Sequence, residues 1–336
     1  MNRIFLITIS LLLITACQEK ALDPQENTSW AFVANEGNYG STNGTISMID
    51  DFGNVYETDI IGATVQSIEV YKNKLIVLIN GNHEIKIYNI NSDGLDMPGI
   101  KVSTEDSSPR NLTIVNDKVY FTNWNTQDVK VFNLFNYTIE ASIPVQGLPE
   151  DIKFDGEHLW VTIPHTGLDF GTANTVAKLD PNTNTLTQVY EVGDGPQEIA
   201  FNNGEIYVSR THYDAEYNAF HGATKISDEN GVIINNYGVG AACGGSILSY
   251  QANMYRSFDG GLSKMNANLG LDLNNKIGSF NQSQVYHVEE NEGNIWFAIT
   301  DYENLTHEVH VIDFKGDLIN SYEVGIFPGD FAFWKK

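Results

Sequence analysis

The stretch RTHYDAEYNAFHG, Arg210 to Gly222, groups two histidines, three acidic or amide side chains and three aromatic rings between two strand-like runs. A hairpin turn needs only a few residues rich in Gly, Asn or Asp, so this segment is longer and more aromatic than chain reversal requires. Imidazole can exchange protons or ligate a cation near neutral pH, and aromatic rings stack on flat ligands. The composition therefore predicts a role beyond connecting two strands.

A metal site is the first alternative for this segment. His212, Asp214, Glu216 and His221 carry ligand atoms that could hold a cation. However, the pattern H-x-D-x-E is also what one polar side of an extended loop looks like, and no spacing typical of a zinc or calcium site is present. We therefore predict no metal and no cofactor.

Histidine catalysis is the second alternative. His165, His212 or His221 could serve as the general base of a lyase that opens a ring. The sequence offers no matched acid, nucleophile motif or oxyanion signature beside them. Cys243 in AACGG could be a nucleophile, but CGG at the entrance of a strand is more simply close packing near an axis. No catalytic residue is assigned, and binding is favoured over catalysis.

The segment sits inside a repeat of about 44 residues that is built from short strands. The first element reads GLPEDIKF or DGPQEIAF, the second HLWVTIP or EIYVSRT, and the third ends in turns such as AKLDPNTN. Asp, Asn and Gly in those turns favour tight reversals, and no segment has a convincing helical apolar period. These patterns predict an all-β protein made of repeated small sheets.

The two ends of the chain hold complementary parts of one more repeat. SWAFVANEG, Ser29 to Gly37, matches the second element without a first element before it, and the chain ends in GIFPGDFAFW, a first element with nothing after it. With six complete repeats, this predicts a seven-bladed β-propeller whose C-terminal strand completes the first blade. An open solenoid or a sandwich would not explain the partial repeats. We expect a single propeller domain over 29–336, after a signal peptide at 1–16 and a tether at 17–28.

Propeller geometry places the loops between second and third strands on one face, around the mouth of the central channel. The two longest of these loops, 164–174 and 210–222, come from consecutive repeats. Loops on a rigid scaffold commonly carry binding residues, although any one ring could equally seal the barrel. The predicted ligand-binding residues are Tyr39, Trp124, His165, Phe170, Arg210, His212, Tyr213, Tyr217, Phe220, Phe258 and Tyr302.

The N-terminus and the charge indicate where the protein acts. Arg3, an apolar run over 4–14 and small residues before Cys17 are typical of a secretory signal, and LITAC resembles a bacterial lipobox. Cys17 is therefore the predicted lipidation site, which makes the membrane a partner through the lipid anchor. The chain has 43 acidic and 19 basic residues, which argues against nucleic acid as a partner.

The strands VYFTNW, LWVTIP and IYVSRT resemble the YVTN-type propeller repeat, and FVANEGNYGSTNGTISMID is similar to the first blade of YncE-like surface lipoproteins of Bacteroidota. That group includes cobalamin-capturing propeller lipoproteins that work with a TonB-dependent transporter. The resemblance implies an outer-membrane lipoprotein at the cell surface, with the periplasmic side as the alternative. It also implies capture of a small molecule, with a corrinoid as the sharpest candidate. A propeller lyase or hydrolase using a histidine at the channel mouth, and a propeller that binds only protein, stay open as alternatives.

Overall fold

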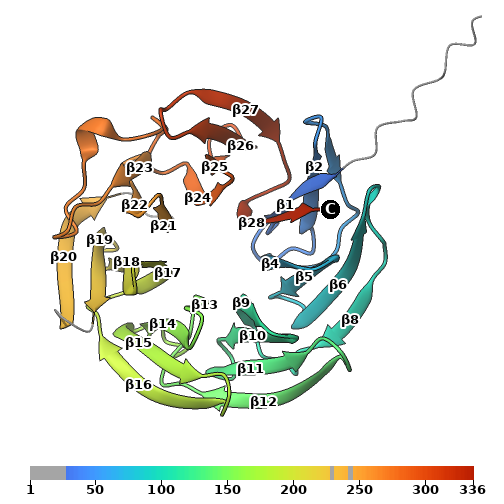
Figure 1. Cartoon of the computed structure of the whole chain (residues 1–336), viewed down its shortest axis with the longest axis horizontal. Helices are drawn as coiled ribbons and strands as arrows, with labels where there is room; N and C mark the ends of the chain where they lie inside the picture. Colours follow the sequence, from blue (N-terminus) through green and yellow to red (C-terminus); the bar gives the residue numbers. More distant parts are fainter. Residues whose placement is uncertain (1–27, 228–230, 241–244) are drawn as a thin grey trace, which may run out of the picture.

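The computed structural model describes residues 28–227, 231–240 and 245–336, which form a ring of seven β-sheets around a central axis (Figure 1). Apart from one 3-10 turn, Leu273–Asn275, every regular element in these ranges is a strand. We number the sheets as blades one to seven in chain order, starting with the sheet that contains β1. The arrangement confirms the predicted all-β, seven-bladed propeller.

The innermost strand of each blade borders the axis. In β17 and β24 the buried residues are spaced three apart, and the residues between them are only partly buried because they border the central cavity. The inner strands, from blade one to blade seven, are β28 (Pro328–Lys335), β4 (Val65–Tyr71), β9 (Pro109–Val115), β13 (Ile152–Phe154), β17 (Pro196–Asn202), β21 (Ile247–Tyr250) and β24 (Val285–Asn291).

The second strand of most blades is buried on both faces, because the neighbouring blades cover it from either side. This explains why the second element of each repeat reads as a nearly continuous apolar run rather than an alternating one. These strands are β1 (Ser29–Asn35), β5 (Lys74–Ile79), β10 (Lys118–Asn123), β14 (Leu159–His165), β18 (Glu205–Tyr213), β22 (Asn253–Phe258) and β25 (Asn294–Asp301).

The third and outer strands extend each sheet from the interior of the ring to its solvent-exposed rim. The third strands are β2 (Thr45–Asp50), β6 (Glu84–Asn91), β11 (Asp128–Asn133), β15 (Thr172–Asp180), β19 (Ala219–Ser227), β23 (Gly261–Lys264) and β26 (Thr306–Asp313). The outer strands are β3 (Val55–Glu57), β8 (Ile100–Ser103), β12 (Thr138–Pro144), β16 (Thr185–Glu191), β20 (Gly231–Gly240) and β27 (Leu318–Glu323), with a short β7 (Gly94–Leu95) also beside β6. Within the described residues the sheet of blade six has three strands.

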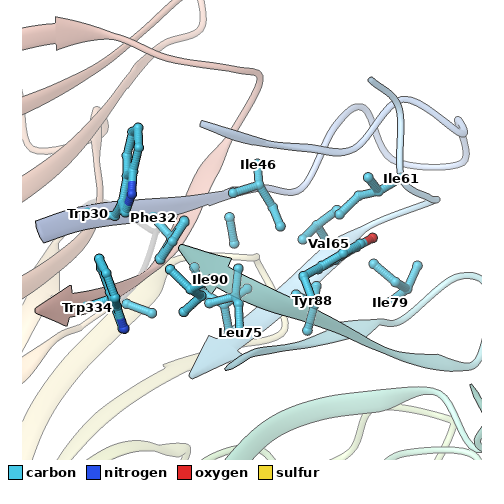
Figure 2. Packing of buried hydrophobic residues seen from close by; sticks show 14 residues of the cluster. Trp30, Phe32, Ile46, Ile61, Val65, Leu75, Ile79, Tyr88, Ile90 and Trp334 are labelled. Atoms are coloured by element: carbon cyan, nitrogen blue, oxygen red, sulfur yellow. The ribbon is translucent and has the colours of Figure 1, made fainter. Parts of the chain in front are cut away.

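Apolar clusters between adjacent blades hold the ring together. Figure 2 shows the cluster between blades one and two, where Trp30 and Phe32 of β1 lie near Trp334 of β28 and pack with Val65 of β4 and Leu75 of β5. Trp30 and Trp334 are each 4% exposed. Each blade therefore depends on its neighbours for burial, which makes the ring a rigid support for the loops at its faces.

The C-terminal strand closes the ring. β28 pairs antiparallel with β1, with Trp30 opposite Trp334 and Val33 opposite Phe331. The two strands come from opposite ends of the chain and share blade one, as Figure 1 shows. The predicted closure is confirmed.

Several predictions concern residues outside the described ranges. The signal peptide at 1–16, the lipidation site Cys17, nearly all of the tether and Cys243 fall there. Among the described residues, none forms a helix with the length and apolar character needed to cross a bilayer.

Candidate functional site at the channel mouth

A polar cavity of about 620 Å³ occupies the axis of the ring. It is lined mainly by inner strands, on which residues two apart share a face. His287 and Glu289 line the cavity; Val288 between them also borders it, but this residue is 2% exposed and packs in an apolar cluster. The charged lining residues are Glu36, Arg110, Glu150, Asp151, Lys153, Glu198, His287, Glu289, Glu290 and Asp330. Seven carboxylates face three basic side chains, so the cavity favours neutral and cationic ligands over anions.

Burial shifts several carboxyl groups at the axis toward their neutral forms. Desolvation raises the pKa of Glu69 to about 7, partly offset by Lys153. It also raises the pKa of Asp151 to about 6 and, together with the charge of Glu289, that of Asp330 to about 7. Repulsion between neighbouring carboxylates and their removal from water both raise these pKa values.

The basic groups of the channel are held in their charged forms. Burial opposes the charge of His287, but the hydrogen bonds that it donates to the carboxylates of Glu198 and Glu289 raise its pKa well above the ordinary value. Burial likewise opposes the charge of Lys153, and the surrounding carboxylates, Asp151 first among them, raise its pKa. The channel therefore contains fixed positive charges that only partly balance its carboxylates.

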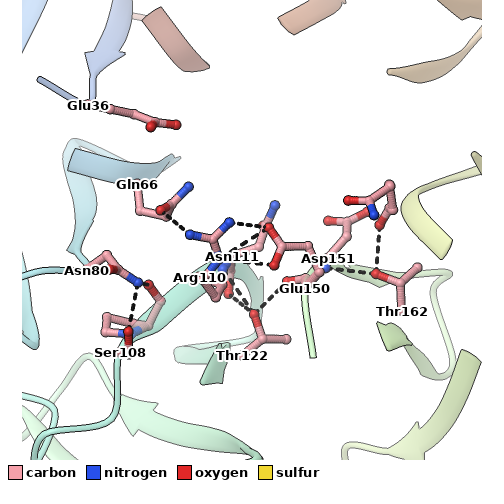
Figure 3. A network of polar contacts seen from close by, with 12 residues as sticks. Glu36, Gln66, Asn80, Ser108, Arg110, Asn111, Thr122, Glu150, Asp151 and Thr162 are labelled. Atoms are coloured by element: carbon pink, nitrogen blue, oxygen red, sulfur yellow. Dashed lines mark hydrogen bonds and ion pairs between the residues drawn. The ribbon is translucent and has the colours of Figure 1, made fainter. Parts of the chain in front are cut away.

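Arg110 links three blades at the top of this cavity (Figure 3). Its Nε and Nη2 donate to Oε2 and Oε1 of Glu150 at 3.0 and 2.6 Å, and its Nη1 donates to Oε1 of Gln66 at 2.6 Å. Thr122 Oγ1 donates to the backbone oxygen of Glu150 at 2.6 Å. The guanidinium carbon lies 4.1 Å from the ring centroid of Trp124. A bidentate ion pair and a cation–π contact thus fix Trp124 at the mouth.

A second pocket, of about 500 Å³, opens beside this network. Arg110, Glu150 and Gln197 line both cavities, so the pocket adjoins the axial channel. Its other walls come from the ends of the second strands of blades three, four and five and from the loops that follow them. The segment 210–222 is not one long loop as predicted, because β18 runs to Tyr213 and pairs with β19 from Ala219, which leaves 214–218 as the connection. The ring of Phe170 contacts Trp124 edge-on at 5.5 Å and His165 at 5.4 Å between centroids. We call this the aromatic pocket; its ring-bearing residues are Trp124, His165, Phe170, His212, Tyr213 and Tyr217.

Three polar atoms on the walls of the aromatic pocket are buried without a hydrogen-bond partner. They are Nε1 of Trp124, Nδ1 of His165 and Nδ1 of His212. Buried polar side-chain atoms are nearly always paired in folded proteins. Burial also lowers the pKa of His165, which favours the neutral imidazole that can donate or accept. A ligand with a polar rim could satisfy these atoms.

The structure thus brings six of the predicted binding residues into one pocket, and five lie elsewhere. Tyr39 is fully exposed, and Phe220 stacks on His212 at 5.5 Å from behind the pocket lining. Phe258 packs against His221 at 5.5 Å, and Tyr302 contacts Phe327 at 5.8 Å.

Arg210 lies in the protein interior, at 2% exposure. Its Nη2 donates to the backbone oxygen of Asn235 at 3.0 Å and to Oδ1 of Asn236 at 2.5 Å. Its backbone oxygen accepts from Nη2 of Arg256 at 2.9 Å. Its guanidinium therefore joins strands of blade five instead of lining the aromatic pocket.

The metal alternative at 212–221 is not supported by the positions of its residues. Asp214 accepts from the backbone nitrogens of Glu216 and Asn218 and so closes its own turn. His221 lies on β19, where its Nδ1 is 3.2 Å from Oγ1 of Thr211. Among the described residues, the histidine and carboxylate groups that could share an ion are His287, Glu289 and Asp330.

The charged channel is the part of the site that the sequence analysis missed. Arg110, Glu150, Asp151, Glu198 and Asp330 stand one or two places after the proline that begins a first element, in PRN, PED, PQE and PGD. This repeated position is a sequence signal for side chains at the axis. The other charged lining residues, Glu36, Lys153, His287, Glu289 and Glu290, do not follow this pattern.

Comparisons with known proteins support the fold. No protein-family profile matches the chain, and no curated protein matches it by sequence. A protein from Lactobacillus plantarum is similar at a TM-score of 0.65 and 11% identity, over 92% of this chain and 100% of that chain. A putative 6-phosphogluconolactonase from Bacteroides fragilis is similar at a TM-score of 0.63 and 14% identity, over 93% of this chain and 99% of that chain. Apo AztD from Citrobacter koseri is similar at a TM-score of 0.56 and 9% identity, over 91% of this chain and 98% of that chain. At these identities the similarity extends to the propeller fold and no further.

Proposed function

We propose that the protein is a binding protein that captures a flat small molecule with a polar rim at the aromatic pocket. The observation that carries this proposal is the convergence of six ring-bearing side chains from three blades on one 500 Å³ pocket at the channel mouth. That volume is in the range of small-molecule sites, which are lined by aromatic groups with a few polar atoms to fix orientation. The unpartnered nitrogens of Trp124, His165 and His212 would provide that orientation.

A corrinoid is the ligand that we propose first. A corrin is a flat ring surrounded by amides. One side of this ring could lie among the aromatic side chains of the pocket, while its amides form hydrogen bonds with the unpartnered nitrogens of Trp124, His165 and His212. The rest of the ring would extend over the mouth of the axial cavity. The acidic lining of that cavity disfavours phosphorylated sugars, which is why we do not transfer the lactonase description of one structural neighbour to this chain.

A protein that captures a ligand for uptake must pass it to a transporter. We therefore also propose that this protein is a lipoprotein at the outer surface of the outer membrane and that it passes its ligand to a TonB-dependent transporter. The support for this part is the resemblance of LITAC to a lipobox and of the first blade to YncE-like surface lipoproteins. The acyl chains on Cys17 would be the anchor, and the propeller face with the aromatic pocket would be open to ligand.

Trp124→Ala and Tyr213→Ala are each expected to weaken binding of cyanocobalamin by about 5- to 1,000-fold, because aromatic side chains that a ligand buries carry about 1 to 4 kcal/mol in binding sites. Titration calorimetry on the purified protein measures the effect. Phe135→Ala is the matched control, since this exposed ring lies in the turn between β11 and β12, on the opposite face.

Equal affinity of the pocket variants and the parent would contradict the aromatic pocket as the site. If no corrinoid binds but haem or another flat ligand does, the pocket stands and the corrinoid assignment fails. Turnover of a cyclic ester that His165→Ala abolishes would instead favour the histidine enzyme, for which the lowered pKa of His165 and its unpartnered Nδ1 atom are the supporting observations.

Cys17→Ser is expected to move the protein from the membrane fraction to the soluble fraction, or to block its processing, because lipidation would be the membrane anchor. Cys243→Ser, which changes the other cysteine of the chain, should fractionate like the parent. Immunoblots of separated membranes check both. A Cys17→Ser protein that is processed normally and stays with the membrane would remove the anchor from the proposal.

A further inference from the structure

We propose that His287, Glu289 and Asp330 form a binding site for a divalent cation of the zinc class in the wall of the axial cavity. One ligand atom from each residue lies within 4.8 Å of the other two. His287 and Glu289 come from β24 and Asp330 comes from β28, so the site would join blade seven to the strand that closes the ring. This site lies apart from the aromatic pocket and does not depend on the function proposed above.

The distances are close to those that a metal ion requires. Nε2 of His287 is 3.2 Å from Oε1 of Glu289 and 4.0 Å from Oδ1 of Asp330. Tetrahedral ligation with bonds of about 2.0 to 2.2 Å separates ligand atoms by about 3.3 to 3.6 Å. Small side-chain rotations would therefore complete the geometry. Three protein ligands with an open fourth position are typical of zinc sites that keep a water or a substrate.

The contacts of the other ring nitrogen of His287 match those of a metal-bound histidine. A ligating imidazole usually donates its other N–H to a carboxylate, which fixes the tautomer and the orientation of the ring. Nδ1 of His287 lies 3.4 Å from Oε1 of Glu198, which is itself 3.2 Å from Oγ of Ser246. The Nε2 atom is thereby directed toward Glu289 and Asp330.

Backbone groups hold the Asp330 carboxylate in place. Its Oδ2 accepts from the nitrogen of Ile68 at 2.8 Å and its Oδ1 accepts from the nitrogen of Phe331 at 3.0 Å. Each oxygen keeps lone-pair capacity for a metal ion. The carboxylate position is therefore set by two strands, as a preorganised ligand requires.

Charge in the cavity favours a cation at this place. The lining holds seven carboxyl groups against three basic side chains, and one of the three, His287, would give up its imidazolium proton and its charge on becoming a ligand, because a metal binds only the neutral imidazole. Lys153 faces the same carboxylates and opposes a dication, but one ammonium group does not balance the charge. A bound divalent ion would offset the repulsion among carboxylates that lie together in a partly desolvated channel.

The test is zinc binding by the purified full-length protein after chelator treatment. Equilibrium dialysis with metal analysis is expected to give one Zn²⁺ per chain. We expect His287→Gln and Asp330→Asn each to weaken the affinity at least tenfold. His310→Gln is the matched control, because His310 also pairs with a carboxylate, Glu308, at 2.7 Å but does not line the cavity.

Co²⁺ gives a second readout that does not depend on any variant. Its visible absorption is expected to report a site of low coordination number with nitrogen and oxygen ligands, and excess Zn²⁺ should remove the signal. Absence of stoichiometric Zn²⁺, or equal retention by the parent, His287→Gln and Asp330→Asn, would overturn the proposal. Since the probe is the metal alone, failure here is distinct from a failure to bind a corrinoid.

Discussion

Deleting residues 328–336 is expected to lower the melting temperature by more than ten degrees or to prevent folding. The deletion removes β28, which pairs with β1 along its length and contributes the buried side chains Phe331, Ala332 and Trp334. Loss of a buried Phe or Trp side chain alone costs about 3 to 5 kcal/mol. The summed cost of losing two such side chains and leaving a strand edge unpaired approaches the whole free energy of unfolding of an ordinary domain, which is about 5 to 15 kcal/mol.

Removing only Lys336 is the control for this truncation, because that residue is exposed and lies beyond the strand. Calorimetry or circular dichroism melts compare the two proteins with the parent. A synthetic peptide covering 327–336, added in trans, should restore part of the lost stability if the strand simply completes blade one. A truncated protein that melts within two degrees of the parent would show that the ring does not need β28.

The free energy of unfolding of the metal-free protein is expected to fall by about 2 to 4 kcal/mol between pH 5 and pH 8, because one pKa unit corresponds to about 1.4 kcal/mol. Burial raises the pKa of Glu69 to about 7 and that of Asp151 to about 6. A carboxyl whose pKa is raised by folding holds its proton longer in the folded state than in the unfolded state. Between the two pKa values the folded state binds more protons, so stability decreases as pH rises.

Urea titrations at a series of pH values check this slope. Glu69→Gln replaces the carboxyl with a neutral group of the same shape and should make the decline smaller, since Glu69 is one of three carboxyls, with Asp151 and Asp330, whose raised pKa values contribute to it. Glu323→Gln, at an exposed position on β27, should leave the slope unchanged. Stability that is flat or rises from pH 5 to pH 8 would contradict the buried acidic channel.

The blade architecture was predictable because its determinants are local. Strand-forming runs, turn residues and the partial repeats at the two ends all lie within single repeats of the chain. The segment Ser29 to Gly37 has no first element before it, and the C-terminal GIFPGDFAFW is a first element with nothing after it. In the structure the strands of these two segments, β1 and β28, pair with each other. The face on which binding loops gather followed from the same strand order.

The binding residues were only partly predictable, because the direction of a side chain depends on its partners. Phe170, in the loop between β14 and β15, and His212, on β18, both line the aromatic pocket. Arg210 lies on the same strand as His212, at the start of the predicted loop 210–222. Its guanidinium is nevertheless buried in the interior, where the backbone oxygen of Asn235 and Oδ1 of Asn236 on β20 accept its hydrogen bonds. The sequence pattern of a loop does not distinguish these two outcomes.

The fold class, the number of blades and the closure of the ring follow from local patterns in the chain, since strand-forming apolar runs and turn residues act over a few positions. The tertiary structure alone decided what the channel is. Lys153, His287 and Asp330 lie far apart in the chain and meet because inner strands of different blades converge on one axis. Their charges are shifted by one another and by removal from water, and neither effect exists until the ring has closed.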